Sequence, residues 1–165
     1  MEIRWEREED IDAIRDVTSA AFQNAPYSNQ AEAAIVDALR NAGALAVSLV
    51  AVDDRDLVGH IAFSAVMIDG KMNGWYGLGP VSVRPDRQRQ GIGQALIRTG
   101  LSCLKDLHAQ GCVVLGEPGY YDRFGFVSDP DLRYGKVPSG YFQRLAFAPA
   151  VPKGDVSFHN AFNAV

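Results

Sequence analysis

The spacing of apolar residues in the first quarter of the chain predicts one short strand and two helices. Residues 1–5 fit a strand, and acidic residues then precede a helical stripe, since carboxylates stabilise a helix start. The stripe consists of Ile11, Ile14, Val17, Ala21 and Phe22. A second helix is expected to begin at a capping box formed by Asn29 and Glu32, and to end at Gly43.

Three mostly apolar stretches separated by turn residues predict three strands in the middle of the chain. They span residues 45–52, 57–68 and 75–83, with acidic or Asp-Gly turns between them. Two glycines, Gly77 and Gly79, interrupt the third stretch. Glycine inside a strand marks a bulge or a close approach by a ligand, so we expect one of these at this strand.

The second half of the chain begins with a long helical pattern that ends at Gly111. A buried strand at residues 112–115, a short helix at 120–124 and strands at 126–127, 141–147 and 156–158 should follow. Strands and helices alternate without repeats or linkers. The pattern therefore predicts one mixed α/β domain over residues 1–165.

Composition and charge argue against a nucleic-acid-binding, secreted or membrane-spanning protein. Hydrophobic residues make up 47%, and the net charge of −4 argues against a nucleic-acid partner. The charged start lacks the apolar segment of a signal peptide, and no apolar run suits a membrane span, so we expect a cytoplasmic protein. Cys103 and Cys112 lie in helix and strand patterns and are interpreted as buried thiols. His108 and His159 have no metal-ligand spacing, so no metal site is expected.

A glycine loop between a strand and a helix carries the strongest chemical signal. The sequence Gln88-Arg89-Gln90-Gly91-Ile92-Gly93 follows an apolar strand and precedes the long helical pattern. Free amides at a helix start bind anions, and glycines let the backbone approach a phosphate closely. A Walker loop is excluded, because it needs Lys-Ser/Thr after its last glycine and this chain has Gln94-Ala95 there. A dinucleotide-binding fingerprint is excluded too, because it needs a third glycine where Leu96 stands.

The loop matches Gln/Arg-x-x-Gly-x-Gly/Ala and resembles the coenzyme A loop of the GNAT acetyltransferase superfamily. A second GNAT-like motif, an aromatic short helix ending in Gly-Phe, follows as Tyr120-Tyr121-Asp122-Arg123-Phe124-Gly125-Phe126. The resemblance extends over nearly the whole chain, to a bacterial branch of predicted N-acetyltransferases. It implies a mostly antiparallel sheet of six or seven strands, splayed between two parallel central strands and flanked by about four helices.

The resemblance also implies acetyl-CoA as co-substrate. Backbone amides of the strand before the loop would bind the pantetheine arm, and those of the loop would bind the pyrophosphate. The expected cofactor-binding residues are Val81, Ser82, Val83, Gln88, Arg89, Gln90, Gly91, Ile92, Gly93 and Gln94.

Two residues are predicted to act in catalysis. Tyr121 stands where the superfamily places its general-acid tyrosine. Many relatives carry a glutamate on the strand before the loop, but this chain has Gly79-Pro80 there. Glu117, at the end of the next strand, is the predicted base, because desolvation beside the splay would raise its pKa. His60 is the alternative base, although a lone strand histidine is more often a core residue.

The acceptor pocket is expected to be aromatic and uncharged, which leaves the acceptor open between a small-molecule and a peptide amine. Its predicted residues are Phe22, Tyr27, Tyr120 and Tyr141. Two alternatives to an acetyltransferase stay open: a coenzyme A-binding sensor without turnover, and an acyltransferase for another acyl group. A monomer or homodimer is expected, without a membrane or nucleic-acid partner.

Overall fold

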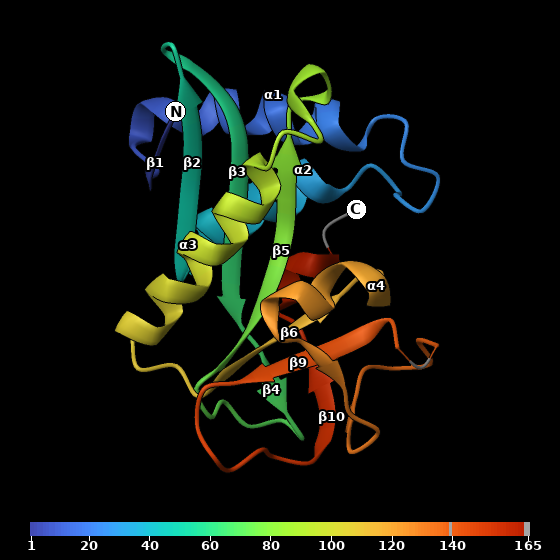
Figure 1. Cartoon of the computed structure of the whole chain (residues 1–165). Helices are drawn as coiled ribbons and strands as arrows, with labels where there is room; N and C mark the ends of the chain where they lie inside the picture. Colours follow the sequence, from blue (N-terminus) through green and yellow to red (C-terminus); the bar gives the residue numbers. More distant parts are fainter. Residues whose placement is uncertain (139, 164–165) are drawn as a thin grey trace.

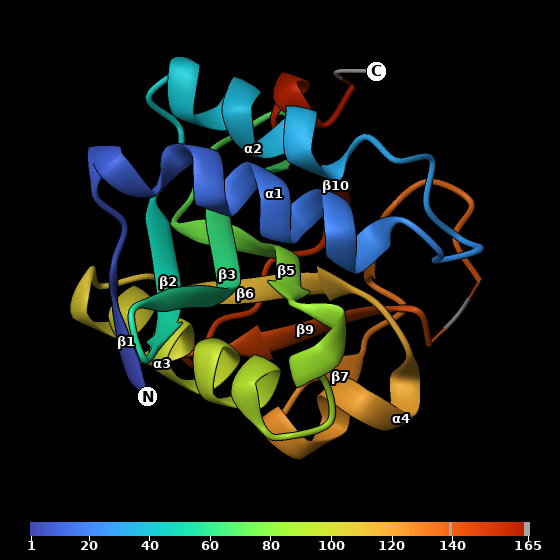
Figure 2. The same ribbon diagram turned by 90° about the horizontal axis from the view of Figure 1, so that it is seen from above.

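The computed structural model describes residues 1–138 and 140–163 and places seven strands in one twisted sheet with helices on both faces (Figures 1 and 2). The strands are β1 (Glu2–Trp5), β2 (Val47–Asp53), β3 (Asp56–Ala65), β4 (Met67–Ile68), β5 (Trp75–Val83), β6 (Gly111–Leu115), β7 (Val127–Ser128), β8 (Leu132–Arg133), β9 (Phe142–Ala146) and β10 (Gly154–Ser157). The α-helices are α1 (Ile11–Phe22), α2 (Glu32–Asn41), α3 (Ile92–Asp106) and α4 (Pro118–Tyr121). The short 3₁₀ helices are η1 (Glu8–Asp10), η2 (Pro85–Arg87), η3 (Asp122–Phe124) and η4 (Asn160–Asn163).

The main sheet confirms the predicted architecture. Its strand order is β1-β2-β3-β5-β6-β9-β7, and β5 and β6 are parallel neighbours while the other neighbours run antiparallel. Helices α1 and α2 cover one face, and α3 and α4 lie on the other (Figure 2). No helix among residues 1–138 and 140–163 is long and apolar enough to cross a membrane.

Two local predictions were wrong. The stretch 57–68 is not one strand, because the chain leaves the main sheet at Val66 and β4 pairs with β10 in a second, three-stranded sheet with β8. The capping box is also absent. Asn29 instead accepts a hydrogen bond from the Ala31 amide (3.1 Å), and Ser28 donates to Glu32 (2.7 Å). Such local side-chain bonds compete with helix capping.

Helix α3 lies unusually close to β3 because glycines stand at two of their contacts. A Cβ on Gly59 would lie 3.0 Å from Leu96 and 3.1 Å from Ile92. A Cβ on Gly100 would overlap the ring of Phe63, which is fully buried. Close packing at both points fixes where α3 begins relative to the sheet, so the core positions the loop that precedes the helix.

On the opposite face of the sheet, His60 of β3 is fully buried in a polar network. The Ser48 hydroxyl donates to the Glu6 carboxylate, and Arg40 holds that carboxylate in turn (2.9 and 3.0 Å). Because the single hydroxyl proton of Ser48 is committed to Glu6, the Nε2–H of His60 must be the donor in its 2.9 Å contact with Ser48. The core-residue interpretation of His60 therefore fits its surroundings.

The same network sets the charge state of His60. Burial lowers the pKa of His60 to about 4, although the nearby Glu6 carboxylate opposes the shift. Burial would raise the pKa of Glu6, but the hydrogen bonds from Arg40 and Ser48 lower it overall. His60 is thus neutral at pH 7, and its 3.9 Å contact with Glu6 is not an ion pair.

Acidification should therefore destabilise the fold through His60. Between pH 6.5 and about pH 4, His60 is protonated in the unfolded chain but neutral in the folded protein. The free energy of unfolding therefore falls as the pH is lowered through this window. The expected loss is roughly 3 kcal/mol. Urea unfolding at several pH values should show it, with a shallower pH dependence in His60→Gln. His108→Gln, which alters an exposed histidine, should leave the wild-type slope, and an equal slope in all three proteins would contradict the assignment.

Candidate active site

The site begins where the two parallel strands separate. β5 and β6 pair at Trp75–Gly111, Tyr76–Cys112 and Gly77–Val113. Beyond these pairs, β5 continues beside β3 alone and β6 continues beside β9. At Ile61–Phe63 the register between β3 and β5 shifts, so that one residue of β3 faces both Gly79 and Pro80. This is the bulge predicted from the glycines, and it turns β5 away from β6.

Backbone donors line the open edge of β5. The Arg84 amide donates to the Val58 carbonyl of β3 (2.8 Å), and amides alternate in direction along a strand. The Ser82 amide therefore faces β3, whereas those of Val81 and Val83 face the gap. The Ser82 side chain is also buried, so Ser82 presents no donor to the open edge, unlike its two neighbours.

The glycine loop adds a second set of donors. Gly91 caps α3 in the left-handed conformation, with φ 86°, and the first helical bond runs from the Ala95 amide to the Gly91 carbonyl (3.0 Å). The amides of residues 92–94 are consequently free of helical partners, and no side chain caps them. Together with the helix dipole, they form an anion site.

Two of the basic side chains near the loop are already paired with carboxylates. Arg84 forms two hydrogen bonds with Asp86 (2.7 and 3.2 Å), and Arg87 pairs with Asp53. The Gln88 side chain is exposed but already has a partner, because its amide donates to the Val83 carbonyl (3.0 Å) and braces the loop. Among the described residues, Arg89 has no such partner, so it is the loop cation that is free to meet a phosphate.

Tyr121 lies in an aromatic cluster beside the splay. Its ring centroid is 5.0 Å from that of Tyr120 and 5.9 Å from that of Phe126. Gly116 makes room for the ring, since a Cβ there would overlap it. Burial raises the pKa of Tyr121 above its usual range, so the hydroxyl keeps its proton at neutral pH.

Tyr120 lies beside the first turn of α3. Its hydroxyl is 3.8 Å from the position of a Cβ on Gly93, in the first turn of α3, and Arg123 covers its ring at 4.5 Å. Neighbouring side chains on a one-turn helix point in different directions, and here Tyr120 points to the loop. Tyr120 therefore lies beside the glycine loop as well as in the Tyr121 cluster.

The remaining predicted acceptor residues lie on loops. Phe22 ends α1 and packs edge-to-face with Tyr27 (6.5 Å), which is 82% exposed. Tyr141 precedes β9, is 46% exposed and accepts a hydrogen bond from the Gly116 amide through its carbonyl (2.8 Å). The loop after α1 and the segment before β9 both lie at the α4 end of the sheet (Figure 1). Each carries an exposed tyrosine, Tyr27 on the first and Tyr141 on the second.

Glu117 precedes α4 directly and is exposed. The desolvation expected for it is absent, because the strand end opens to solvent at this point. The two thiols are free: Cys112 is fully buried, which raises its pKa, and Cys103 is partly buried. No cluster of three metal-binding side chains occurs in the described parts of the chain.

Comparison with known proteins assigns this arrangement to a family. Residues 45–128, from β2 to β7, match the model of the acetyltransferase (GNAT) domain. The chain belongs to the GNAT acetyltransferase family. Among curated proteins, it is 38% identical to the uncharacterized N-acetyltransferase YhbS of Escherichia coli K12 over 83% of this chain and 86% of that protein. It is also 36% identical to the uncharacterized N-acetyltransferase YjhQ of the same strain, over 71% of this chain and 64% of that protein.

Two solved GNAT structures resemble the whole fold. A GNAT family acetyltransferase from Brucella melitensis, in complex with acetyl-CoA, is 55% identical, with a TM-score of 0.89 over 98% of this chain and 97% of that one. YhbS from Escherichia coli, in complex with CoA, is 34% identical, with a TM-score of 0.86 over 98% and 91%. The predicted family and fold are thereby confirmed.

Sequence reasoning missed two features of this GNAT site. The pairing of Arg87 with Asp53 joins residues 34 positions apart, and no local pattern indicates it. The space that Gly116 leaves for Tyr121 was also missed. The glycine itself, placed between a buried strand and an aromatic helix, was the available signal for such a close contact.

Gly91 offers a direct test of the anion site. In Gly91→Asp, a negative charge would enter the cradle formed by amides 92–94, so acetyl-CoA should no longer raise the melting temperature. Gly91→Asn is the matched control, because it has the same size and the same left-handed backbone cost without the charge. Differential scanning calorimetry should give both variants similar melting temperatures without ligand. A full acetyl-CoA shift in Gly91→Asp would contradict the assignment.

Proposed function

We propose that the chain acts as a single domain over residues 1–165 and transfers the acetyl group of acetyl-CoA to an amine by direct attack on the thioester. The free Val81 and Val83 amides carry this proposal, because they lie on the open edge of β5 that leads to the glycine loop. The acetyl-CoA and CoA complexes of the similar proteins from Brucella melitensis and Escherichia coli support it.

The backbone supplies the cofactor contacts in this proposal. Amides of residues 92–94, with Arg89, receive the pyrophosphate. The two open-edge amides of β5 receive the pantetheine arm, and one of them polarises the thioester carbonyl as an oxyanion-hole donor does. Gln88 and Gly91 shape the loop: one through its side-chain bond to Val83 and the other through its left-handed backbone. Gln90, whose side chain accepts from Arg87 (3.3 Å), contributes through its backbone.

Tyr121 is the proposed general acid. The acylated amine forms as the C–N bond is made and the C–S bond breaks, and the departing thiolate then needs a proton. A hydroxyl whose pKa is raised by burial is fully protonated at neutral pH, so it carries the proton that the departing thiolate needs. Gly116 fixes the ring in place, so the donor is positioned before the reaction.

Glu117 is the proposed base, and the acceptor enters between the loop after α1 and the segment before β9. An exposed carboxylate at the start of α4 can take the ammonium proton through water. Phe22, Tyr27 and Tyr141 would contact the acceptor, a small-molecule or peptide amine. The exposed aromatic surface at this entrance suits an apolar group attached to the amine.

A coenzyme A-binding sensor without turnover is the second candidate. One observation favours it: β5 carries no carboxylate, and the proposed base lies in solvent. Isothermal titration with acetyl-CoA, followed by thiol release over a panel of amines, separates the two. Binding with amine-dependent thiol release supports the transferase. Binding without release from any amine supports the sensor.

Removal of the Tyr121 hydroxyl tests the acid. Tyr121→Phe should lower kcat by about 10²-fold, the usual scale of general acid–base help, while acetyl-CoA affinity stays near wild type. Tyr120→Phe is the matched control, because its hydroxyl lies by the first turn of α3. It should change acetyl-CoA affinity more than kcat. Equal kcat values in Tyr121→Phe and wild type would mean that Tyr121 only packs in the aromatic cluster and does not act as the acid.

The base is tested by the pH dependence of the rate. Glu117→Gln should lower kcat/KM most near neutral pH, and the loss should shrink above the pKa of the acceptor amine, where no base is needed. Glu9→Gln changes an exposed carboxylate near the N-terminus and should follow the wild-type profile. Parallel profiles for Glu117→Gln and wild type would mean that the amine loses its proton elsewhere.

A further inference from the structure

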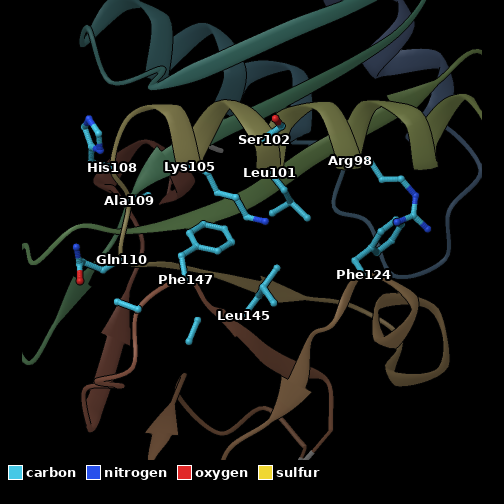
Figure 3. Close-up of a pocket in the computed structure, with 12 residues that line it drawn as sticks. Arg98, Leu101, Ser102, Lys105, His108, Ala109, Gln110, Phe124, Leu145 and Phe147 are labelled. Carbon is cyan, nitrogen blue, oxygen red and sulfur yellow. The ribbon is translucent and has the colours of Figure 1, made fainter.

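A hollow lies on the α3 side of the sheet, between α3 and β9 (Figure 3). Its volume is about 840 Å³. Arg98, Leu101, Ser102 and Lys105 line one wall, at the spacing of a single helix face. Phe124, Leu145 and Phe147 line the other side. We call this hollow the α3–β9 groove.

The groove exists because the helices on this face cover only part of the sheet. Helix α3 packs over β2, β3 and β5, on one side of the splay. On the other side, α4 and η3 together span only residues 118–124. The half of β9 beside the end of α3 therefore lacks a helical cover, and Leu145 and Phe147 are left partly buried at its surface.

The groove is cationic although the protein as a whole is acidic. The Arg98 guanidinium lies over the Phe124 ring at 4.9 Å, and the Lys105 ammonium lies 5.4 Å from the Phe147 ring centroid. Within the described chain, neither cation has a carboxylate within 4.0 Å, in contrast to Arg84 and Arg87 at the loop. An aromatic floor and unpaired cations together suit a ligand that is both apolar and anionic.

The far end of the groove is separate from the coenzyme A loop. The loop amides belong to the first turn of α3, and Lys105 lies near its end. Twelve residues of helix separate Gly93 from Lys105, which corresponds to roughly 18 Å. A phosphate held by the loop therefore leaves the Lys105 end of the groove free, whereas Arg98 and Phe124 lie at the end nearer the loop.

We propose that the α3–β9 groove binds an elongated amphipathic anion, an aryl or alkyl chain with a terminal acidic group. The acidic group pairs with Lys105, and the apolar body lies on Leu101, Leu145 and Phe147. A cavity of about 840 Å³ has the size of small-molecule sites in proteins. Phe124 belongs to both the groove and the Tyr121 cluster, at 6.2 Å between the ring centroids, so an occupant would lie against the same aromatic cluster as the active site.

The fluorescent probe 8-anilinonaphthalene-1-sulfonate has this chemistry and tests the proposal. The full-length protein is first saturated with coenzyme A, and the probe is then titrated. One equivalent should bind. Lys105→Gln should weaken probe binding about tenfold, because it removes the charge that faces the sulfonate. Lys71→Gln is the matched control on an exposed lysine of the β4 turn, and it should bind the probe as wild type does.

A blocking variant makes the test independent of charge. Ser102 is exposed on the groove wall, so Ser102→Trp should fill the groove and abolish probe binding without disturbing the core. Each variant should keep the wild-type melting temperature, which excludes probe binding to a loosened fold. Equal probe affinity in all four proteins would overturn the proposal. So would probe binding to the free protein that is absent from the coenzyme A complex, because the groove would then belong to the cofactor site.

Discussion

The active site depends on one constraint, which is that β5 and β6 stop pairing after Gly77 and Val113. Parallel strands normally exchange backbone hydrogen bonds along their length, so the separation leaves donors without partners. The bulge at Gly79 and Pro80 causes it, since a bulge bends its strand and increases the local twist. The amides at positions 81 and 83 would otherwise be bonded to β6 and unavailable to a substrate.

The same constraint explains how the glycine loop and the aromatic helix come to lie on either side of one gap. The glycine loop follows β5 and the aromatic helix α4 follows β6. Each therefore lies at the end of its strand where β5 and β6 are no longer paired. Close packing at Gly59 and Gly100 places α3 against β3, so the start of the helix has a fixed position beside the end of β5. The gap is thus bounded by rigid elements, as preorganised binding requires.

What could be predicted from the sequence was local. The loop, the bulge and the long helix each carry their signal within a dozen residues, through glycine spacing and helical periodicity. The second sheet could not be predicted, because β4 and β8 are two residues long and pair with β10, far along the chain. The direction of Tyr120 and the exposure of Glu117 also depend on packing against distant elements. Local residue patterns contain neither of these.

The two sides of the proposed site differ in their chemistry. Backbone amides bind the cofactor in our proposal, and any sequence that folds the loop and the bulge provides them, which is why a short motif suffices. In the same proposal, the acceptor side consists of side chains such as Tyr27 and Tyr141 on loops, whose identities can change without altering the sheet. Our proposal therefore assigns acceptor choice to the residues that the fold constrains least. The Tyr121 ring is the exception, because Gly116 and the aromatic cluster fix a single side chain as firmly as the backbone fixes its amides.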